Sequence, residues 1–377
     1  MNFTMVPFLD AVEDVSAGNR KIPRAEFSEY GRHPVVDQGQ KLIAGYTDSA
    51  DLLARTNGPI IVFGDHTRAF KYVDFPFAMG ADGVKLLRCR DEFYPKFVYH
   101  YLRSYDLPSA GYSRHFKFLK RIEVPKPPLV EQHRIASILD KVDAIRSWRS
   151  KALHHLDLLE RSIFHELVGD DDWRSVTTAR RGKNSAGWEW VPLNRVARMA
   201  TGHTPDRTRQ GYWDGDIPWV SLPKIRELDG RMAVDVEPKV TEAGIANSSA
   251  VVLPAGTVCF SRTASVGFVT KLGRPMATSQ DFHNWTPGDS LDSDYLMAAL
   301  RFSRLHLLSA SDGSIHRTIY QRVAERFHIL LPPLEVQRDF AARKQRVDIE
   351  RSNAQRSLAA IEEMLRSLQS RAFGGEL

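Results

Sequence analysis

The chain has 377 residues, of which 42% are hydrophobic and 26% charged, and this balance favours two or three globular domains and excludes a disordered chain. No apolar run has the length of a membrane span, the first ten residues lack the pattern of a signal peptide, and the two cysteines, Cys89 and Cys259, exclude a disulfide framework and a cysteine-rich zinc site. We therefore expect a cytoplasmic protein without membrane association, and its net charge of +6 favours a polyanionic partner.

Residues 1–126 are predicted to form a first α+β domain. Short apolar runs at 59–64 and 70–75 alternate with turn residues, which is typical of strands. Residues 94–105 have a helical pattern instead.

A long helix is predicted over residues 127–168. Pro127 and Pro128 suit a helix start, and neither proline nor glycine follows until Gly169. With Arg149 at the one polar position, apolar side chains recur at alternating spacings of three and four, a heptad pattern that packs one helix against another. The predicted packing residues are Ile135, Ile138, Val142, Ile145, Leu156, Leu159 and Ile163.

A polar linker is predicted at residues 169–188 and a second α+β domain at 189–331. The strand candidates of this domain are residues 217–220, 256–260 and 267–270, and residues 294–308 are helical in pattern.

A second long helix is predicted from Pro332 and Pro333 to the end of the chain, over residues 332–377. Its regular apolar positions are Leu358, Ile361, Leu365 and Leu368. At 1.5 Å per residue, each long helix spans roughly 60 Å. We expect the two helices to bury their apolar edges on each other as an antiparallel pair, and oligomerisation through these edges is the alternative.

The chain contains an internal repeat. Pro-Pro-Leu followed by glutamine occurs at 127–132 and again at 332–337, and Val6-Pro7 matches Val191-Pro192. The interiors of the two domains differ in length and residue order. A repeated frame with divergent interiors is expected of two domains that bind the same kind of partner but recognise different features of it.

Polar loops supply the candidate DNA contacts, because arginine, asparagine and glutamine recognise base edges while basic and hydroxyl side chains contact phosphates. A Gly-Ser-His-basic loop recurs ahead of both long helices. In the first domain the candidates are His66, Arg68, Lys71, Arg114, His115 and Lys117. In the second domain they are His203, Thr204, Arg207, Arg262, Gln280, His283, Asn284, His316 and Arg317.

Signatures of catalysis are absent from the sequence. It has no phosphate-binding loop with Lys-Ser/Thr, no dinucleotide-binding glycine pattern and no Asn/Asp-Pro-Pro-aromatic motif of adenine methyltransferases. The histidine spacing predicts no metal site. We therefore expect a chain without catalytic residues, bound cofactor or metal.

Nearly the whole chain resembles the specificity subunits of type I restriction-modification systems. The resemblance is carried by Pro-Pro-Leu-x-x-Gln at the start of each long helix and by the closing segment 370–377. Residues 253–262 and 276–282 resemble one subtype of target recognition domain, and residues 30–46 resemble another. Glu335-Val336-Gln337 departs from the usual pattern, which has an acidic residue directly before the glutamine.

The resemblance implies an α+β protein with two target recognition domains separated by a long antiparallel two-helix coiled coil, in a pseudo-twofold repeat. Its expected role is to recognise a bipartite, asymmetric site on double-stranded DNA. It would assemble with two modification subunits, which bind S-adenosylmethionine and methylate adenine at N6, and with restriction subunits that use ATP and Mg²⁺. The related type IIB specificity subunits, or a coiled-coil scaffold with incidental DNA binding, are the alternatives.

Overall fold

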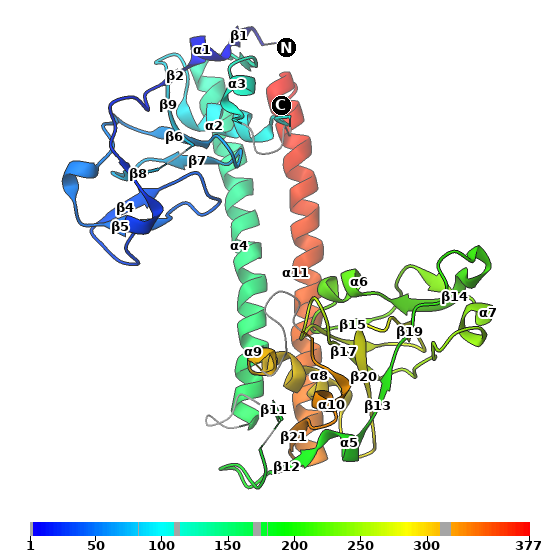
Figure 1. The fold of residues 1–377 in the computed structure, drawn as a ribbon. Helices are drawn as coiled ribbons and strands as arrows, with labels where there is room; N and C mark the ends of the chain where they lie inside the picture. The colour runs from blue at the N-terminus through cyan, green and yellow to red at the C-terminus, as the bar shows by residue number, and fades with distance from the viewer. Residues whose placement is uncertain (1–2, 82, 109–113, 169–174, 179, 310–317) are drawn as a thin grey trace. The chain divides into compact units, whose positions relative to one another are not determined.

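A computed structural model describes residues 3–81, 83–108, 114–168, 175–178, 180–309 and 318–377. The chain forms two compact units: unit 1 comprises residues 1–151 and 354–377, and unit 2 comprises residues 152–353. The boundary between them cuts both long helices instead of falling in the predicted linker. Each unit therefore contains one globular α+β domain and one part of each long helix, which confirms the predicted fold class (Figure 1).

The domain of unit 1 contains three small sheets. The first pairs β1 (Met5–Pro7) with β10 (Glu123–Pro125). The second has the order β2 (Val12–Asp14), β9 (Val84–Cys89), β6 (Ile60–Gly64), β7 (Phe70–Val73). The third has the order β3 (Lys21–Ile22), β8 (Ala78–Gly80), β4 (His33–Val36), β5 (Gly45–Thr47).

Short helices complete this domain: α1 (Phe8–Ala11), α2 (Pro95–Ser104), α3 (Phe116–Leu119) and the single 3-10 turns η1 (Arg24–Glu26) and η2 (Ala50–Leu52). Strands β6 and β7 and helix α2 confirm the three elements predicted from the sequence. Helix α2 buries Phe97, Val98 and Leu102 in a core shared with the start of the first long helix.

The domain of unit 2 also contains three sheets. The first has the order β11 (Val176–Thr177), β21 (His328–Leu331), β12 (Glu189–Pro192). The second has the order β13 (Ala197–Thr201), β20 (Phe282–Pro287), β17 (Val258–Ser261), β18 (Val269–Leu272), β15 (Arg231–Ala233). The third has the order β16 (Lys239–Val240), β14 (Trp213–Val220), β19 (Ala277–Thr278).

Its helices are α5 (Leu193–Val196), α6 (Leu222–Glu227), α7 (Glu242–Ala246), α8 (Ser293–Phe302), α9 (Arg304–Ser309) and α10 (Gln321–Ala324), with the 3-10 turn η3 (Gln210–Tyr212). The three predicted strands fall in β14, β17 and β18. The predicted helix over 294–308 is divided between α8 and α9 at Ser303, whose hydroxyl accepts the Val176 N–H.

The predicted linker is wrong at residues 175–177. Strand β11 pairs antiparallel with β21, and Ser175, Val176 and Thr177 are buried. A two-residue strand has no periodicity from which it could be predicted, and its stability comes from pairing with β21, in which Ile329 lies opposite Val176.

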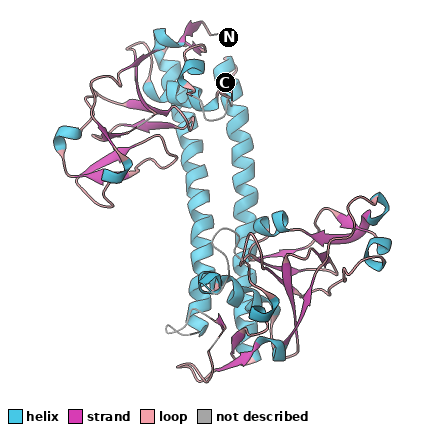
Figure 2. Ribbon diagram, viewed as in Figure 1, coloured by secondary structure: helices cyan, strands magenta, loops and turns pink. Residues whose placement is uncertain are grey.

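The two long helices are α4 (Leu129–Val168) and α11 (Leu334–Gly374), close to the predicted bounds (Figure 2). Gly375 ends α11 in the left-handed region with φ +76°, and Glu376 donates its N–H to the Arg371 carbonyl. This is the glycine-dependent C-terminal cap that satisfies the last carbonyls of a helix. None of the described helices combines the length and apolar character needed to cross a bilayer.

Within each unit, the parts of α4 and α11 lie alongside each other. In unit 1, Arg134 near the start of α4 donates to the carbonyl of Leu377, just beyond the end of α11. In unit 2, Glu166 pairs with Arg343, and Glu160 pairs with Arg351. Residue numbers therefore rise along α4 where they fall along α11, which makes the two helices antiparallel.

The predicted apolar edge is buried in part. Ile135, Val142 and Leu365 are buried, while six other positions are half-buried: Ile138, Leu156, Ile163, Leu358, Ile361 and Leu368. Ile145 and Leu159 are exposed, at 48% and 46%, so they do not pack between α4 and α11, and a packing role for them against a partner subunit stays a prediction. Burial is concentrated near the domain helices α2 and α8, which cover the parts of the long helices that carry Val142 and Phe164.

A frame of the same elements attaches each domain to its long helix: a pair of antiparallel strands followed directly by the start of that helix. Val6 pairs with Val124 in unit 1, and Val191 pairs with Ile329 in unit 2. These pairs keep the offsets of 185 and 205 residues found in the sequence repeat. The repeat is therefore an internal repeat of structure as well as sequence.

Candidate nucleic-acid interface

The turn between β6 and β7 presents Arg68 at the surface of unit 1. Arg68 has φ +61°, and its N–H donates to the Gly64 carbonyl, which closes the turn. Its guanidinium Nη1 donates to the Leu107 carbonyl at 2.9 Å. A left-handed residue is required at this point of the tight turn, and the side-chain bond fixes the direction of the arginine.

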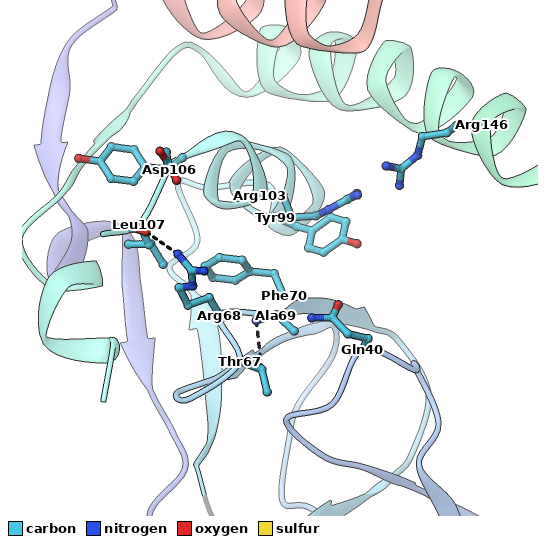
Figure 3. Close-up of a pocket in the computed structure, with 11 residues that line it drawn as sticks. Gln40, Thr67, Arg68, Ala69, Phe70, Tyr99, Arg103, Asp106, Leu107 and Arg146 are labelled. Atoms are coloured by element: carbon cyan, nitrogen blue, oxygen red, sulfur yellow. Dashed lines mark hydrogen bonds between the residues drawn. The ribbon is translucent and has the colours of Figure 1, made fainter. Parts of the chain in front are cut away.

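A polar pocket of about 590 Å³ opens beside this turn (Figure 3). Three guanidinium groups line it from three different elements: Arg68 from the turn, Arg103 from α2 and Arg146 from α4. The other lining residues are Gln40, Thr67, Ala69, Phe70, Tyr99, Tyr105, Asp106 and Leu107. Arginine guanidinium groups can bind phosphate oxygens through two hydrogen bonds and can stack on planar groups such as aromatic rings.

Asp143 of α4 orients two of these arginines. It forms an ion pair with Arg103 and another with Arg146, at 3.1 Å. The Arg103 guanidinium also lies over the Tyr99 ring, 5.1 Å from its centroid. One carboxylate between two guanidinium groups leaves the pocket with a net positive charge even when Asp106 is counted.

A second pocket of about 570 Å³ adjoins the same turn through Asp65 and His66. Two of the predicted contacts, His66 and Arg114, line it together with Gln38, Lys21 and Lys85. Lys85 is paired with Asp14 at 2.8 Å. The turn and the loop at residues 38–40 therefore contribute to both pockets, and Lys117 is exposed nearby on α3.

Two predicted contacts of unit 1 are buried and hold the turn from inside. The Lys71 ammonium donates to the Asp37 carbonyl at 2.7 Å, and burial lowers the pKa of Lys71. His115 Nδ1 is bonded to the Asp65 carbonyl at 2.9 Å. The prediction that Lys71 and His115 contact DNA is therefore corrected, because a buried polar side chain that is bonded to a carbonyl has no face toward solvent.

In unit 2, three predicted residues from separate loops form one hydrogen-bonded cluster. The Thr204 hydroxyl donates to Gln280 Oε1 at 2.5 Å, and Arg262 Nε donates to the Gln280 carbonyl at 2.8 Å. Thr204 follows β13, Arg262 follows β17 and Gln280 precedes β20. The ends of neighbouring strands thus bring an arginine and a glutamine to one edge of the five-stranded sheet.

Arg207 and His203 flank this cluster. The Arg207 guanidinium lies 5.4 Å from the centroids of both Trp213 and Trp219. The Trp219 indole N–H donates to the His203 carbonyl at 3.1 Å, and both His203 and Arg207 are exposed. Gly202 is required before them, because a Cβ there would lie 2.2 Å from the Ser279 carbonyl.

The prediction fails for His283 and Asn284, which are fully buried in β20. Burial lowers the pKa of His283 to about 4, so the ring is neutral, and its Nε2 bonds the Ile319 carbonyl. Asn284 donates to the Thr278 hydroxyl. Both side chains stabilise the domain interior. His316 and Arg317, also predicted, lie outside the described residues.

Sequence reasoning missed Arg103, Arg146 and Gln40. Arg103 and Tyr99 are four residues apart on a predicted helix, a spacing that places them on one helix face and that was a usable signal. Arg146 gave no such signal, because its position near the turn depends on how α4 packs against the domain. Among the residues that the structure describes, no three His, Cys, Asp or Glu side chains form a group suited to a metal ion.

Comparison with protein families finds one matching model, described as the type I restriction modification DNA specificity domain. It matches residues 8–153 and 185–363, which include both domains and most of both long helices. The match therefore occurs twice along the chain, once in each half of the repeat.

Two curated relatives are type I restriction enzyme specificity subunits. The EcoR124I/EcoR124II subunit of Escherichia coli is 28% identical over 255 residues, covering 62% of this chain and 57% of the relative. The MjaIX subunit of Methanocaldococcus jannaschii is 26% identical over 162 residues, covering 42% of this chain and 38% of the relative. The aligned part of the chain thus spans about half the length of these relatives or less.

Two solved structures have the same fold over nearly the whole chain. The type I restriction-modification S subunit from M. genitalium aligns with a TM-score of 0.61 at 15% identity, covering 99% of this chain and 96% of the other. A chain from a structure that describes complex assembly of the type I restriction-modification system aligns with a TM-score of 0.55 at 17% identity. The alignment covers 100% of this chain and 98% of the other.

Proposed function

The chain belongs to the family of type I restriction modification DNA specificity domains, and from this premise we propose that it is the DNA-specificity subunit of a type I restriction-modification system. Its role is to recognise double-stranded DNA at a bipartite, asymmetric site. Each domain recognises one half of that site. The chain itself performs no chemistry.

One observation carries this proposal: the same frame holds two different polar surfaces. The strand pairs and helix starts repeat between the units, whereas the surfaces beside them do not. Unit 1 presents arginines around pockets, and unit 2 presents a Thr-Gln-Arg cluster beside two tryptophans. A repeated frame suits docking on a repetitive partner such as a duplex, and different surfaces suit two different base sequences.

In unit 1 we assign the DNA contacts to His66, Arg68, Arg114 and Lys117, and we add Arg103 and Arg146. The arginine pocket suits a backbone phosphate, because the guanidinium groups of Arg103 and Arg146, from two separate helices, line it. Arg68, at the tip of a turn, is the candidate for a base edge.

In unit 2 we assign the contacts to His203, Thr204, Arg207, Arg262 and Gln280. Gln280 is held at both its carbonyl and its side chain, so its amide is oriented before DNA binds. An oriented amide discriminates better between base edges than a free one, because less freedom is lost on binding.

The partners we propose are two modification subunits and the restriction subunits. The former would supply S-adenosylmethionine and adenine-N6 methylation, and the latter ATP-dependent cleavage. Exposed apolar side chains on the long helices support a docking role: Ile145 and Trp148 in unit 1, Leu158 and Leu159 in unit 2. Apolar groups clustered on an exposed surface mark binding sites more often than isolated ones do.

Methylation mapping tests this function. The chain is expressed with the modification subunits of its own host in cells that otherwise lack adenine methylation, and methylated sites are sequenced on single molecules. We expect one asymmetric motif with two defined parts separated by a constant number of undefined base pairs. A continuous motif, or no new methylation with active partners, contradicts the proposal.

A further inference from the structure

A buried glutamine near the start of α4 joins the long helix to the domain of unit 1. Gln132 is fully buried, and its Oε1 accepts the Tyr94 N–H at 2.7 Å. Its Nε2 donates to the Glu92 carbonyl at 3.0 Å and to the Pro127 carbonyl at 2.9 Å. Both amide donors and one acceptor position are thus used.

The same bonds recur in unit 2. Gln337 is fully buried, and its Oε1 accepts the Asp292 N–H at 2.8 Å. Its Nε2 donates to the Ser290 carbonyl at 3.1 Å and to the Pro332 carbonyl at 2.8 Å. Each glutamine therefore bonds the first proline of its own motif and two backbone groups that lie two residues apart in the domain. We call these two bond sets the glutamine clamps.

Only glutamine satisfies this geometry among residues of its length. Glutamate would place a second oxygen against two carbonyls, and methionine would leave one N–H and two carbonyls without partners. Buried backbone groups without partners are costly, and so are rarely tolerated. The glutamine of each Pro-Pro-Leu-x-x-Gln motif is thus explained by its clamp.

Each clamp holds the residue immediately before a domain helix. Helix α2 begins at Pro95, next to Tyr94, and α8 begins at Ser293, next to Asp292. Ion pairs also join each domain helix to its long helix. In unit 1, Lys96 of α2 pairs with Asp140 of α4 at 2.7 Å, and in unit 2, Asp294 of α8 pairs with Lys344 of α11 at 3.7 Å. The clamp and the ion pair together fix both the position and the direction of the domain helix on its long helix.

We propose that Gln132 and Gln337 are positioning residues for spacer length: each fixes the orientation of one recognition domain on its long helix and so the distance between the two half-sites that are bound together. This inference rests on the proposed function. Neither glutamine is exposed, so neither contacts a base. Loosening a clamp widens the range of domain orientations, and the base preference of each domain stays as it was.

The test uses the full chain with its modification subunits and plasmids whose two half-sites, once mapped, are separated by the natural spacer or by one base pair more or fewer. Methylation is compared for Gln132→Met, Gln337→Met and the control Gln345→Met, which replaces an exposed glutamine of α11. We expect the preference for the natural spacer to fall about tenfold in each clamp variant and to be unchanged in the control. The preferred bases should stay the same in all three.

A uniform loss of methylation at every spacer would overturn the positioning role and leave the glutamines as stabilising residues only. Should the methionine variants not fold, Gln132→Asn and Gln337→Asn keep an uncharged amide at each position but shorten its reach, and the same spacer comparison is made with them. In the unchanged chain, hydrogen exchange gives a second test: the Tyr94 and Asp292 N–H groups should exchange slowly, and exchange as fast as in exposed loops contradicts the clamps. Failure of the proposed function is recognised separately, because the unsubstituted chain would then methylate no split site.

Discussion

The two globular domains are attached to the long helices in the same way but differ in almost every feature of their exposed surfaces. Both have a strand pair of equal register next to the helix start and a glutamine clamp beside it. Beyond these shared contacts, the largest sheets have four strands in unit 1 and five strands in unit 2. The comparison shows that strand pairing and buried glutamine side chains bonded to the backbone maintain the attachment. The surfaces that differ between the units lie on the turns, loops and helix faces beside it.

The attachments themselves differ in burial. At the end of α4, Phe164 is fully buried and its ring contacts those of Tyr295, Phe302 and Phe340. At the end of α11, Phe373 is half-buried. The helix pair of unit 2 is therefore expected to be the more sensitive to substitution, and the predictions below test this difference.

The largest effect is expected for Phe164→Ala. Removing a fully buried aromatic side chain costs about 3–5 kcal/mol, whereas Phe373→Ala removes a half-buried one and costs about 1.5 kcal/mol. Urea denaturation followed by far-ultraviolet circular dichroism measures both. Equal losses would show that the two attachments do not differ in burial as described.

A somewhat smaller difference is expected for the ion pairs. Glu160 is 1% exposed and pairs with Arg301 and Arg351, whereas Asp140 is 36% exposed. Glu160→Ala leaves buried Arg351 with weaker compensation and should cost about 3 kcal/mol. Asp140→Ala, at a more solvated site, should cost about 1 kcal/mol or less. The same denaturation experiment, repeated in high salt, should reduce only the Asp140 effect.

A pH effect should distinguish the buried histidines. Burial lowers the pKa of His283 to about 4, against 6.5 in the unfolded chain, so acidification from pH 6.5 to 4 favours unfolding. Each pH unit in that window should cost about 1.4 kcal/mol of stability. Burial also lowers the pKa of His100, but Asp140 and Asp143 oppose the shift.

Stability measured at pH 7 and pH 5 tests this for His283→Gln, with His203→Gln as the exposed control. The His283 variant should lose less stability on acidification than the unsubstituted chain, and the control should lose the same amount. An unchanged pH dependence in the His283 variant would mean that folding does not lower the pKa of this ring.

The smallest effect is expected for Arg146→Gln in the arginine pocket. If Arg146 contacts a phosphate, affinity should fall about tenfold or less for every DNA sequence, and the slope of log K against log salt should decrease by about one. Arg149→Gln, an exposed position of the same helix outside the pocket, is the control. A loss confined to one DNA sequence would assign Arg146 to base recognition instead.

The long helices and the repeat were predictable because their signals are local. Heptad spacing, paired prolines at a helix start and glycines at a helix end are each recognised within a few turns of one helix. The burial of Lys71, His115, His283 and Asn284 was not predictable, because each depends on a partner distant in sequence, such as the Asp65 carbonyl for His115. A polar loop residue and a buried polar residue have the same appearance in sequence, and only the tertiary partner distinguishes them.

The central claim is that two unlike surfaces on one repeated frame recognise the two halves of a split site. Single-molecule methylation mapping of Arg68→Ala and Gln280→Ala chains, each assembled with its modification subunits, tests it most directly. We predict that Arg68→Ala alters base preference in one half of the motif only, and that Gln280→Ala alters it in the other half only. Changes at the same bases in both variants would contradict the claim.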